Sequence, residues 1–170
     1  MNNVNVSTFL RKRYLDVDKI DQSSFFSIDS KQDLELNTEL FTGDFIYIEG
    51  AVIIEIYGRK ILDFEHYDYP FWFFGQFYNQ VENISQGESF EIPFLETPRT
   101  LIVESVNYHS YLVKLLSLNN IDYQVSVSKR DFLAPLYRSA LQLFSIADYY
   151  EKEKYGKWVE TLRNLYQEFE

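Results

Sequence analysis

The sequence contains no cysteine, which excludes disulfide bonds, thiolate catalysis and zinc sites built from cysteine. It has only two histidines, and His109 stands alone in a predicted turn, where we expect it to be exposed rather than functional. Long apolar runs are missing, and the first residues, MNNVNVSTFLRKRYLD, lack the apolar region of a secretory signal. We therefore expect a soluble cytoplasmic protein that does not associate with a membrane.

Sequence motifs of catalysis are missing as well. There is no Gly-x-Ser-x-Gly elbow, no glycine-rich phosphate loop and no His-Glu-x-x-His. The densest group of potential ligands is DFEHYD at residues 63–68, and in a strand Asp63 and Glu65 point one way while His66 points the other. A hard cation would need several further oxygens from elsewhere. We favour a solvated strand end that leads into a helix cap, and expect no catalytic residue, metal or cofactor.

Basic residues are scarce in the middle of the chain. The formal net charge is −10, and between Gln32 and Pro98 thirteen acidic side chains face only Arg59 and Lys60. Binding nucleic acid requires a basic surface, so we do not expect it as a direct ligand. Two interpretations of the acidic stretch remain: it keeps the protein in solution, or it binds a basic protein partner.

The clearest structural pattern is a β-hairpin. Between Phe45 and Tyr57 the even positions are apolar, and the alternation resumes at Ile61 after Gly58-Arg59-Lys60. A three-residue loop pairs Ile56 with Leu62 and keeps the core face apolar, so we predict that register. It places Glu55 opposite Asp63 on the outer face, where two like charges are unfavourable unless a basic group lies between them.

A single helix is predicted after the hairpin. Asp68 is its expected N-cap, Pro70 stands in the first turn, and Gly87 is the expected C′ residue, a position that commonly has a positive φ. Its apolar face is rich in phenylalanine, whereas Trp72 falls on the polar face. Two interpretations of Trp72 stay open: the N-terminal segment covers it, or it is a contact residue for a partner.

The remaining pattern predicts an α+β fold. The first twenty residues are ambiguous: their apolar residues suit a short helix as well as any other structure, and three basic residues form a solvated patch. The apolar residues are Val6, Phe9, Leu10, Tyr14 and Val17, and the basic ones are Arg11, Lys12 and Arg13. Ser24 to Ile28 suits a strand, and Leu34 to Phe41 an extended stretch. Four runs of alternating apolar and polar residues follow, as in an antiparallel meander, around residues 90–94, 101–106, 111–118 and 123–127. Ser128 resembles a cap of the first of two C-terminal helices, which Gly156 is expected to separate. At 170 residues we expect one domain, residues 1–170: an antiparallel meander with a helix inserted after the central hairpin and two C-terminal helices packed on the sheet.

Three stretches carry a resemblance to a known class of proteins. They are EGAVIIEIYGRKILDF, DYPFWFFGQFYNQV and QGESFEIPF, within residues 44–127. Their order resembles that of small, acidic bacterial immunity proteins, which bind secreted toxins. The resemblance implies a stoichiometric inhibitor that binds its toxin in the producing cell and carries no catalytic residues.

Two functional hypotheses follow. The first is a non-catalytic binding protein that neutralises a basic toxin, such as a nuclease, and its expected partner-binding residues are Glu49, Glu55, Asp63, Glu65, Asp68 and Trp72. The alternative is a small-molecule-binding or enzymatic domain with a pocket between sheet and helices, near Asp63, Glu65 and His66.

Overall fold

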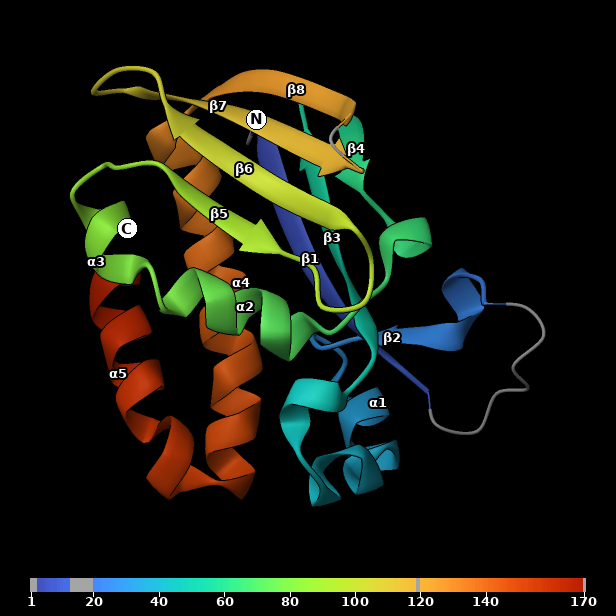
Figure 1. Ribbon diagram of the computed structural model, residues 1–170. Coiled ribbons are helices and arrows are strands. Elements are labelled where there is room, and N and C mark those ends of the chain that lie inside the picture. The colour runs from blue at the N-terminus through green and yellow to red at the C-terminus, as the bar shows by residue number, and fades with distance from the viewer. Residues whose placement is uncertain (1–2, 13–19, 119, 170) are drawn as a thin grey trace.

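The computed structural model describes residues 3–12, 20–118 and 120–169. It confirms the α+β fold, with two four-stranded antiparallel sheets (Figure 1). The first sheet has the order β2-β1-β3-β4, formed by β1 (Val4–Arg11), β2 (Phe25–Ser27), β3 (Gly50–Ile56) and β4 (Arg59–Leu62). The second is the predicted meander of β5 (Phe90–Pro93), β6 (Arg99–Ser105), β7 (Ser110–Ser117) and β8 (Asn120–Ser128).

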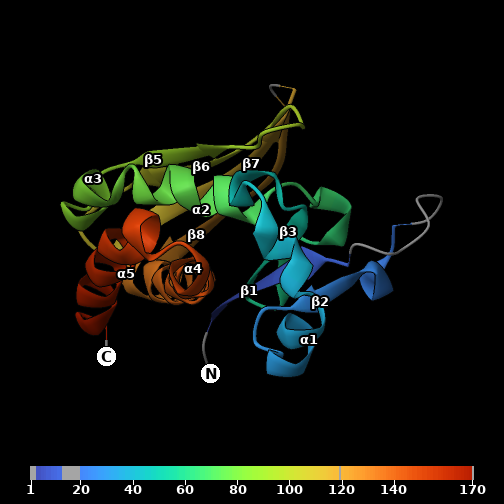
Figure 2. The same cartoon turned by 90° about the horizontal axis from the view of Figure 1, so that it is seen from below.

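Helices connect and cover these sheets. The α-helices are α1 (Lys31–Leu36), α2 (Pro70–Tyr78), α3 (Val81–Ser85), α4 (Lys129–Tyr150) and α5 (Lys152–Gln167). Short 3₁₀ segments are η1 (Gln22–Ser24), η2 (Thr38–Thr42), η3 (Phe45–Tyr47) and η4 (Phe64–His66). Figures 1 and 2 show α4 behind the second sheet, with α5 alongside it and α2 crossing near β5. Buried side chains from both sheets and from α2 to α5 belong to one hydrophobic cluster.

The structure removes the ambiguity of the N-terminal segment. Val4, Val6 and Leu10 are buried on one face of β1, a central strand between β2 and β3, so the ambiguous segment forms a strand and not a short helix. Pairing with β3 along seven positions outweighs the ambiguous local pattern. Arg13, Tyr14 and Val17 lie outside the described residues.

The stretch from Leu34 to Phe41 is helical rather than extended. It contains the end of α1 and most of η2. Ser30 caps α1, because its side chain accepts a hydrogen bond from the Asp33 N–H at 3.3 Å. A serine followed by polar residues was the signal for this helix.

The predicted β-hairpin is confirmed, but the predicted three-residue loop is wrong. Tyr57 and Gly58 form a two-residue loop with φ of 52° and 78°, and Ile56 pairs with Arg59. The register shifts next to Ile54, so that Leu62 faces Ile54 instead of the predicted Ile56. Glu55 consequently pairs with Lys60 instead of Asp63, and the unfavourable pair of like charges does not form.

The predicted single helix is divided into α2 and α3 at Asn79 and Gln80. Tyr69, not Asp68, is the N-cap residue of α2, while Gly87 has the expected positive φ, 76°. The two C-terminal helices, α4 and α5, are separated at Glu151 and not at the predicted Gly156, which lies within α5.

Gly50 holds the first sheet against α2. Its backbone exchanges two hydrogen bonds of 2.9 Å with the backbone of Asp68, which precedes α2, and it also pairs with Leu10 of β1. A Cβ atom at this position would lie 2.7 Å from Pro70 Cγ and would overlap the carbonyl oxygen of Phe9. A side chain is therefore excluded here by backbone and by a rigid ring.

We expect Gly50→Ala to lower the free energy of unfolding by at least about 2 kcal/mol, because the added methyl group forces backbone to move. Urea denaturation measures this loss. Gly43→Ala is the matched control, because a Cβ there meets nothing within 4 Å. Equal stability of the two variants would contradict the role assigned to Gly50.

Candidate functional site

The structure brings three of the six predicted partner-binding residues into one pocket. The acidic pocket has a volume of about 200 Å³ and is lined by Glu49, Glu65, Tyr67, Asp68, Tyr69, Glu96 and Thr97. These residues come from the segments before β3, around η4 and between β5 and β6. The backbone bridge between Gly50 and Asp68 holds the first two segments together.

Asp68 connects the third segment to the other two. Its carboxylate accepts one hydrogen bond from the Tyr69 N–H at 2.8 Å and another from the Glu96 N–H at 3.2 Å. The residue is only 9% exposed. Burial raises the pKa of Asp68 although the two backbone N–H groups act in the opposite direction.

Tyrosines form the wall of the acidic pocket. The Tyr69 hydroxyl donates to Glu96 Oε1 at 3.0 Å, and burial together with the Glu96 carboxylate raises the pKa of Tyr69 to about 12. The phenol therefore stays protonated at neutral pH. Tyr47 packs edge-on against Tyr69, with ring centroids 6.2 Å apart, and is 66% exposed. It forms an aromatic rim beside the pocket.

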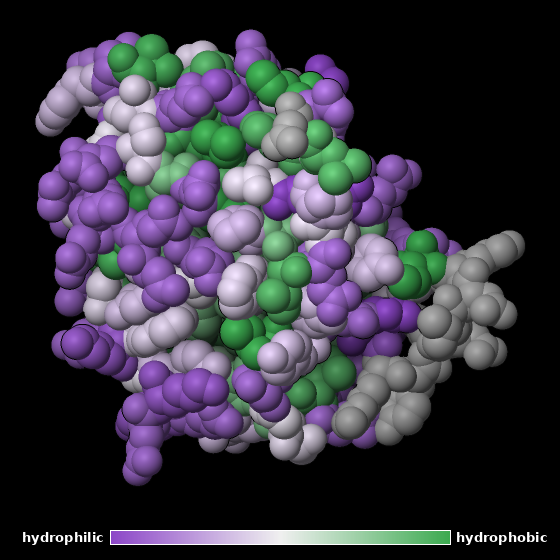
Figure 3. Space-filling model, in the orientation of Figure 1, coloured by the Kyte–Doolittle hydropathy of each residue, from purple (hydrophilic) through white to green (hydrophobic). Residues whose placement is uncertain are grey.

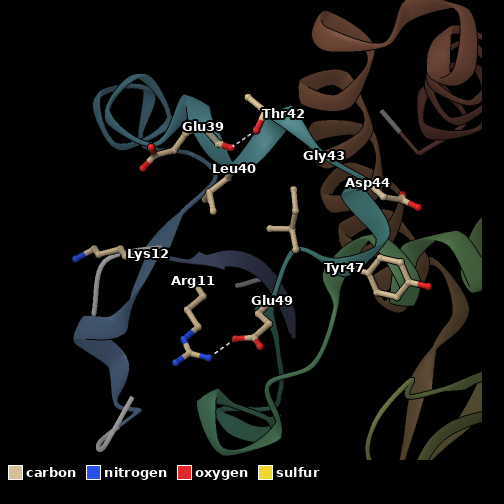
Figure 4. A pocket seen from close by; sticks show the side chains of 10 residues that line it. Arg11, Lys12, Glu39, Leu40, Thr42, Gly43, Asp44, Tyr47 and Glu49 are labelled. Carbon is tan, nitrogen blue, oxygen red and sulfur yellow. Dashed lines mark hydrogen bonds and ion pairs between the residues drawn. The ribbon is translucent and has the colours of Figure 1, made fainter. Parts of the chain in front are cut away.

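The carboxylates of the acidic pocket differ in whether a basic side chain neutralises their charge. Arg11 forms an ion pair with Glu49 from a neighbouring pocket of about 400 Å³, as Figure 4 shows. In the described part of the chain, neither Glu65 nor Glu96 has a cationic partner within 4.0 Å. Two carboxylates thus remain available to a cation from outside.

Two other predicted residues, Glu55 and Asp63, do not line the acidic pocket. Asp63 caps η4: its Oδ1 accepts from the Glu65 N–H at 3.0 Å and lies 2.7 Å from His66 Nδ1. Glu55 lies between Lys60 and Asn5 of the adjacent strands. Within residues 3–12, 20–118 and 120–169, no three His, Asp or Glu side chains are grouped so as to hold a metal ion.

Trp72 is held by the second sheet. Its Nε1 donates to the Pro93 carbonyl oxygen at the end of β5 at 2.9 Å, and the side chain is half-buried. This contact is with β5, and both interpretations of Trp72 stay predictions. Trp72 faces a different pocket from the acidic one.

Sequence reasoning missed five residues of this region: Tyr47, Tyr67, Tyr69, Glu96 and Thr97. The bond that brings Glu96 to Asp68 spans 28 positions, so no local pattern indicates it. Thr97 Oγ1 is buried and has no hydrogen-bond partner among the described residues. The only available signal was the excess of acidic residues in this part of the chain.

The outward face of the second sheet does not single out a ligand class. Ile102, Leu112 and Leu116 are half-buried there, beside the ion pair of Lys114 with Glu104 at 2.6 Å. Figure 3 shows hydrophobic residues on this side of the molecule interrupted by polar ones. Such a mixture is ordinary for a solvent-facing antiparallel sheet.

No protein family, curated protein or solved structure matches this chain. Every helix among the described residues is too short or too polar to cross a membrane. The geometry of the pockets is therefore the basis for the functional argument.

The raised pKa of Asp68 predicts a pH dependence of stability. The folded protein binds this proton more tightly than the unfolded chain does, so the carboxyl group contributes stability below its ordinary pKa of 3.8. That contribution is lost as the pH rises through the raised pKa. We expect the free energy of unfolding of the wild type, relative to Asp68→Asn, to fall from acidic toward neutral pH. Urea denaturation at several pH values checks this, and a difference that is constant or rises with pH would contradict it.

Proposed function

We propose that this protein is a non-catalytic binding protein that neutralises a basic protein partner, as an immunity protein neutralises its toxin. The observation that carries the proposal is the acidic pocket, in which Glu65 and Glu96 lack a cationic partner and lie among tyrosines. A partner's arginine or lysine has the complementary charge and size. Such an inhibitor acts in the cytoplasm of the producing cell.

Charge and aromatic surface have separate roles in this proposal. The net charge of −10 attracts a basic protein from a distance and raises the association rate. Tyr47 and Tyr69 then offer the rigid amphipathic surface that is enriched at energetic centres of interfaces. An arginine side chain can pair with a carboxylate and stack on a tyrosine ring at the same time.

The alternative, that the acidic residues serve solubility alone, explains the pocket less well. Carboxylates that only keep a protein in solution can be spread over the surface. Here Glu49, Glu65, Asp68 and Glu96 converge, and Asp68 is buried, which disfavours its charged form. Convergence of like charges has a cost that a cationic partner would offset.

The first test identifies the partner. We expect the tagged protein to recover one basic protein from a lysate of its native cells at low salt, and less of it at high salt, because salt screens exposed charges. Mass spectrometry names the recovered protein. Co-expression in a host then tests whether the chain protects against that protein's toxicity. Recovery of no basic protein at either salt concentration would contradict the proposal.

The second test concerns the acidic pocket. Glu65→Lys combined with Glu96→Lys should slow association with the recovered protein on the order of tenfold or more at low salt, because the attraction is replaced by repulsion. Stopped-flow or surface-based kinetics measures this rate.

Glu82→Lys combined with Glu160→Lys is the matched control. It changes the net charge equally, at exposed positions of α3 and α5 outside the acidic pocket. If both double variants slow association alike, net charge and not the acidic pocket determines binding.

A further inference from the structure

A second pocket lies between α2, η3 and α5. This aromatic pocket has a volume of about 390 Å³ and shares no lining residue with the acidic pocket. Five of its lining residues are aromatic: Phe71, Trp72, Phe144, Tyr155 and Trp158. They include both tryptophans of the chain. The volume lies at the lower end of the range of small-molecule sites.

Each indole ring is held by a residue outside the aromatic pocket, Trp72 by Pro93 and Trp158 by Tyr78, and Trp158 also by the lining residue Phe144. Trp72 donates to the Pro93 carbonyl oxygen at 2.9 Å. Trp158 stacks on Tyr78 with ring centroids 4.2 Å apart, and Phe144 packs edge-on against it at 4.9 Å. A ligand therefore meets walls that are already ordered, which reduces the entropy lost on binding.

Gly75 lies in the interior of α2 and also lines the aromatic pocket. Its φ is not positive, and an added Cβ would have Trp158 Cζ3 as its nearest contact, at an ordinary 4.0 Å. Neither backbone conformation nor packing requires glycine at this position. Glycine in a helix interior is destabilising relative to alanine. The property it provides here is open space in front of Trp158.

The opening of the aromatic pocket is polar but balanced in charge. Asp44 and Lys154 lie there 4.0 Å apart, with the amide side chains of Gln76 and Asn79. The opposite charges offset one another, so the opening does not favour a strongly charged ligand. Amides can donate and accept hydrogen bonds at the edge of an uncharged ring.

We propose that the aromatic pocket binds a small, uncharged, planar aromatic molecule that carries a hydrogen-bonding group such as a carboxamide. Its ring packs against the tryptophans, and its polar edge lies at the opening. This binding is independent of the proposed inhibition of a basic protein.

The test uses the two tryptophan indole N–H signals in ¹H–¹⁵N spectra of the full chain. Both tryptophans line the aromatic pocket, so both signals report on it. Nicotinamide and indole-3-carboxamide are the probes, and benzoate and benzylamine are the charged comparisons. We expect saturable shifts of both signals with the carboxamides, at a Kd of about 1 mM or lower, and weaker effects of the charged compounds. No saturable shift with either carboxamide, or tighter binding of a charged compound, would overturn the proposal.

Variants of Gly75 give an independent outcome. Gly75→Ala should raise the melting temperature and weaken carboxamide binding about tenfold, because the methyl group favours the helix and occupies the pocket. Gly75→Leu should abolish binding, while Gly43→Leu, which adds the same side chain at a position where a Cβ meets nothing within 4 Å, should leave it unchanged. Undiminished binding by Gly75→Ala would overturn the proposal even if Gly75→Leu does not fold.

Discussion

The close approach of two chain segments at Gly50 is the constraint on which the rest of this structure depends. Because the position has no side chain, the backbone of β3 reaches both the carbonyl of Phe9 and the ring of Pro70. That approach permits the backbone exchange with Asp68, which in turn places the carboxylate of Asp68 under the Glu96 N–H. The backbone contact between Gly50 and Asp68 thus positions the first sheet, the start of α2 and the acidic pocket relative to one another. A substitution at Gly50 would therefore alter the geometry of the candidate site without replacing any of its carboxylates.

Much of the fold could be predicted from the sequence where contacts are local. The meander from β5 to β8 follows from alternation and short turns, and α4 follows from Ser128 as a cap. The register of the first hairpin could not be predicted, because a bulge next to Ile54 keeps Leu62 on the core face with a shorter loop. The central position of β1 could not be predicted either, because it depends on β3, whose paired residues lie between 40 positions (Leu10 and Gly50) and 52 positions (Val4 and Ile56) away.

The candidate site, like the fold, could be predicted from the sequence only in part. Acidic composition pointed to Glu49, Glu65 and Asp68, which do line one pocket. It could not separate them from Asp63, whose carboxylate caps η4, or from Glu55, which faces Lys60. Glu96 and Tyr69 were missed because their hydrogen bond spans 27 positions. The excess of acidic residues indicated the region, and only the tertiary structure distinguishes the carboxylates that line the acidic pocket from those that do not.

The central position of β1 also has a consequence for the order in which the protein can form. Residues Val4 to Leu10 are synthesised long before their main partner, β3, so their apolar side chains have no sheet to join in the nascent chain. The second sheet has no such delay, because each of its strands pairs with the next one made. The acidic pocket needs residues from Glu49 to Thr97. A ribosome-bound chain therefore cannot present it until Thr97 has left the ribosome.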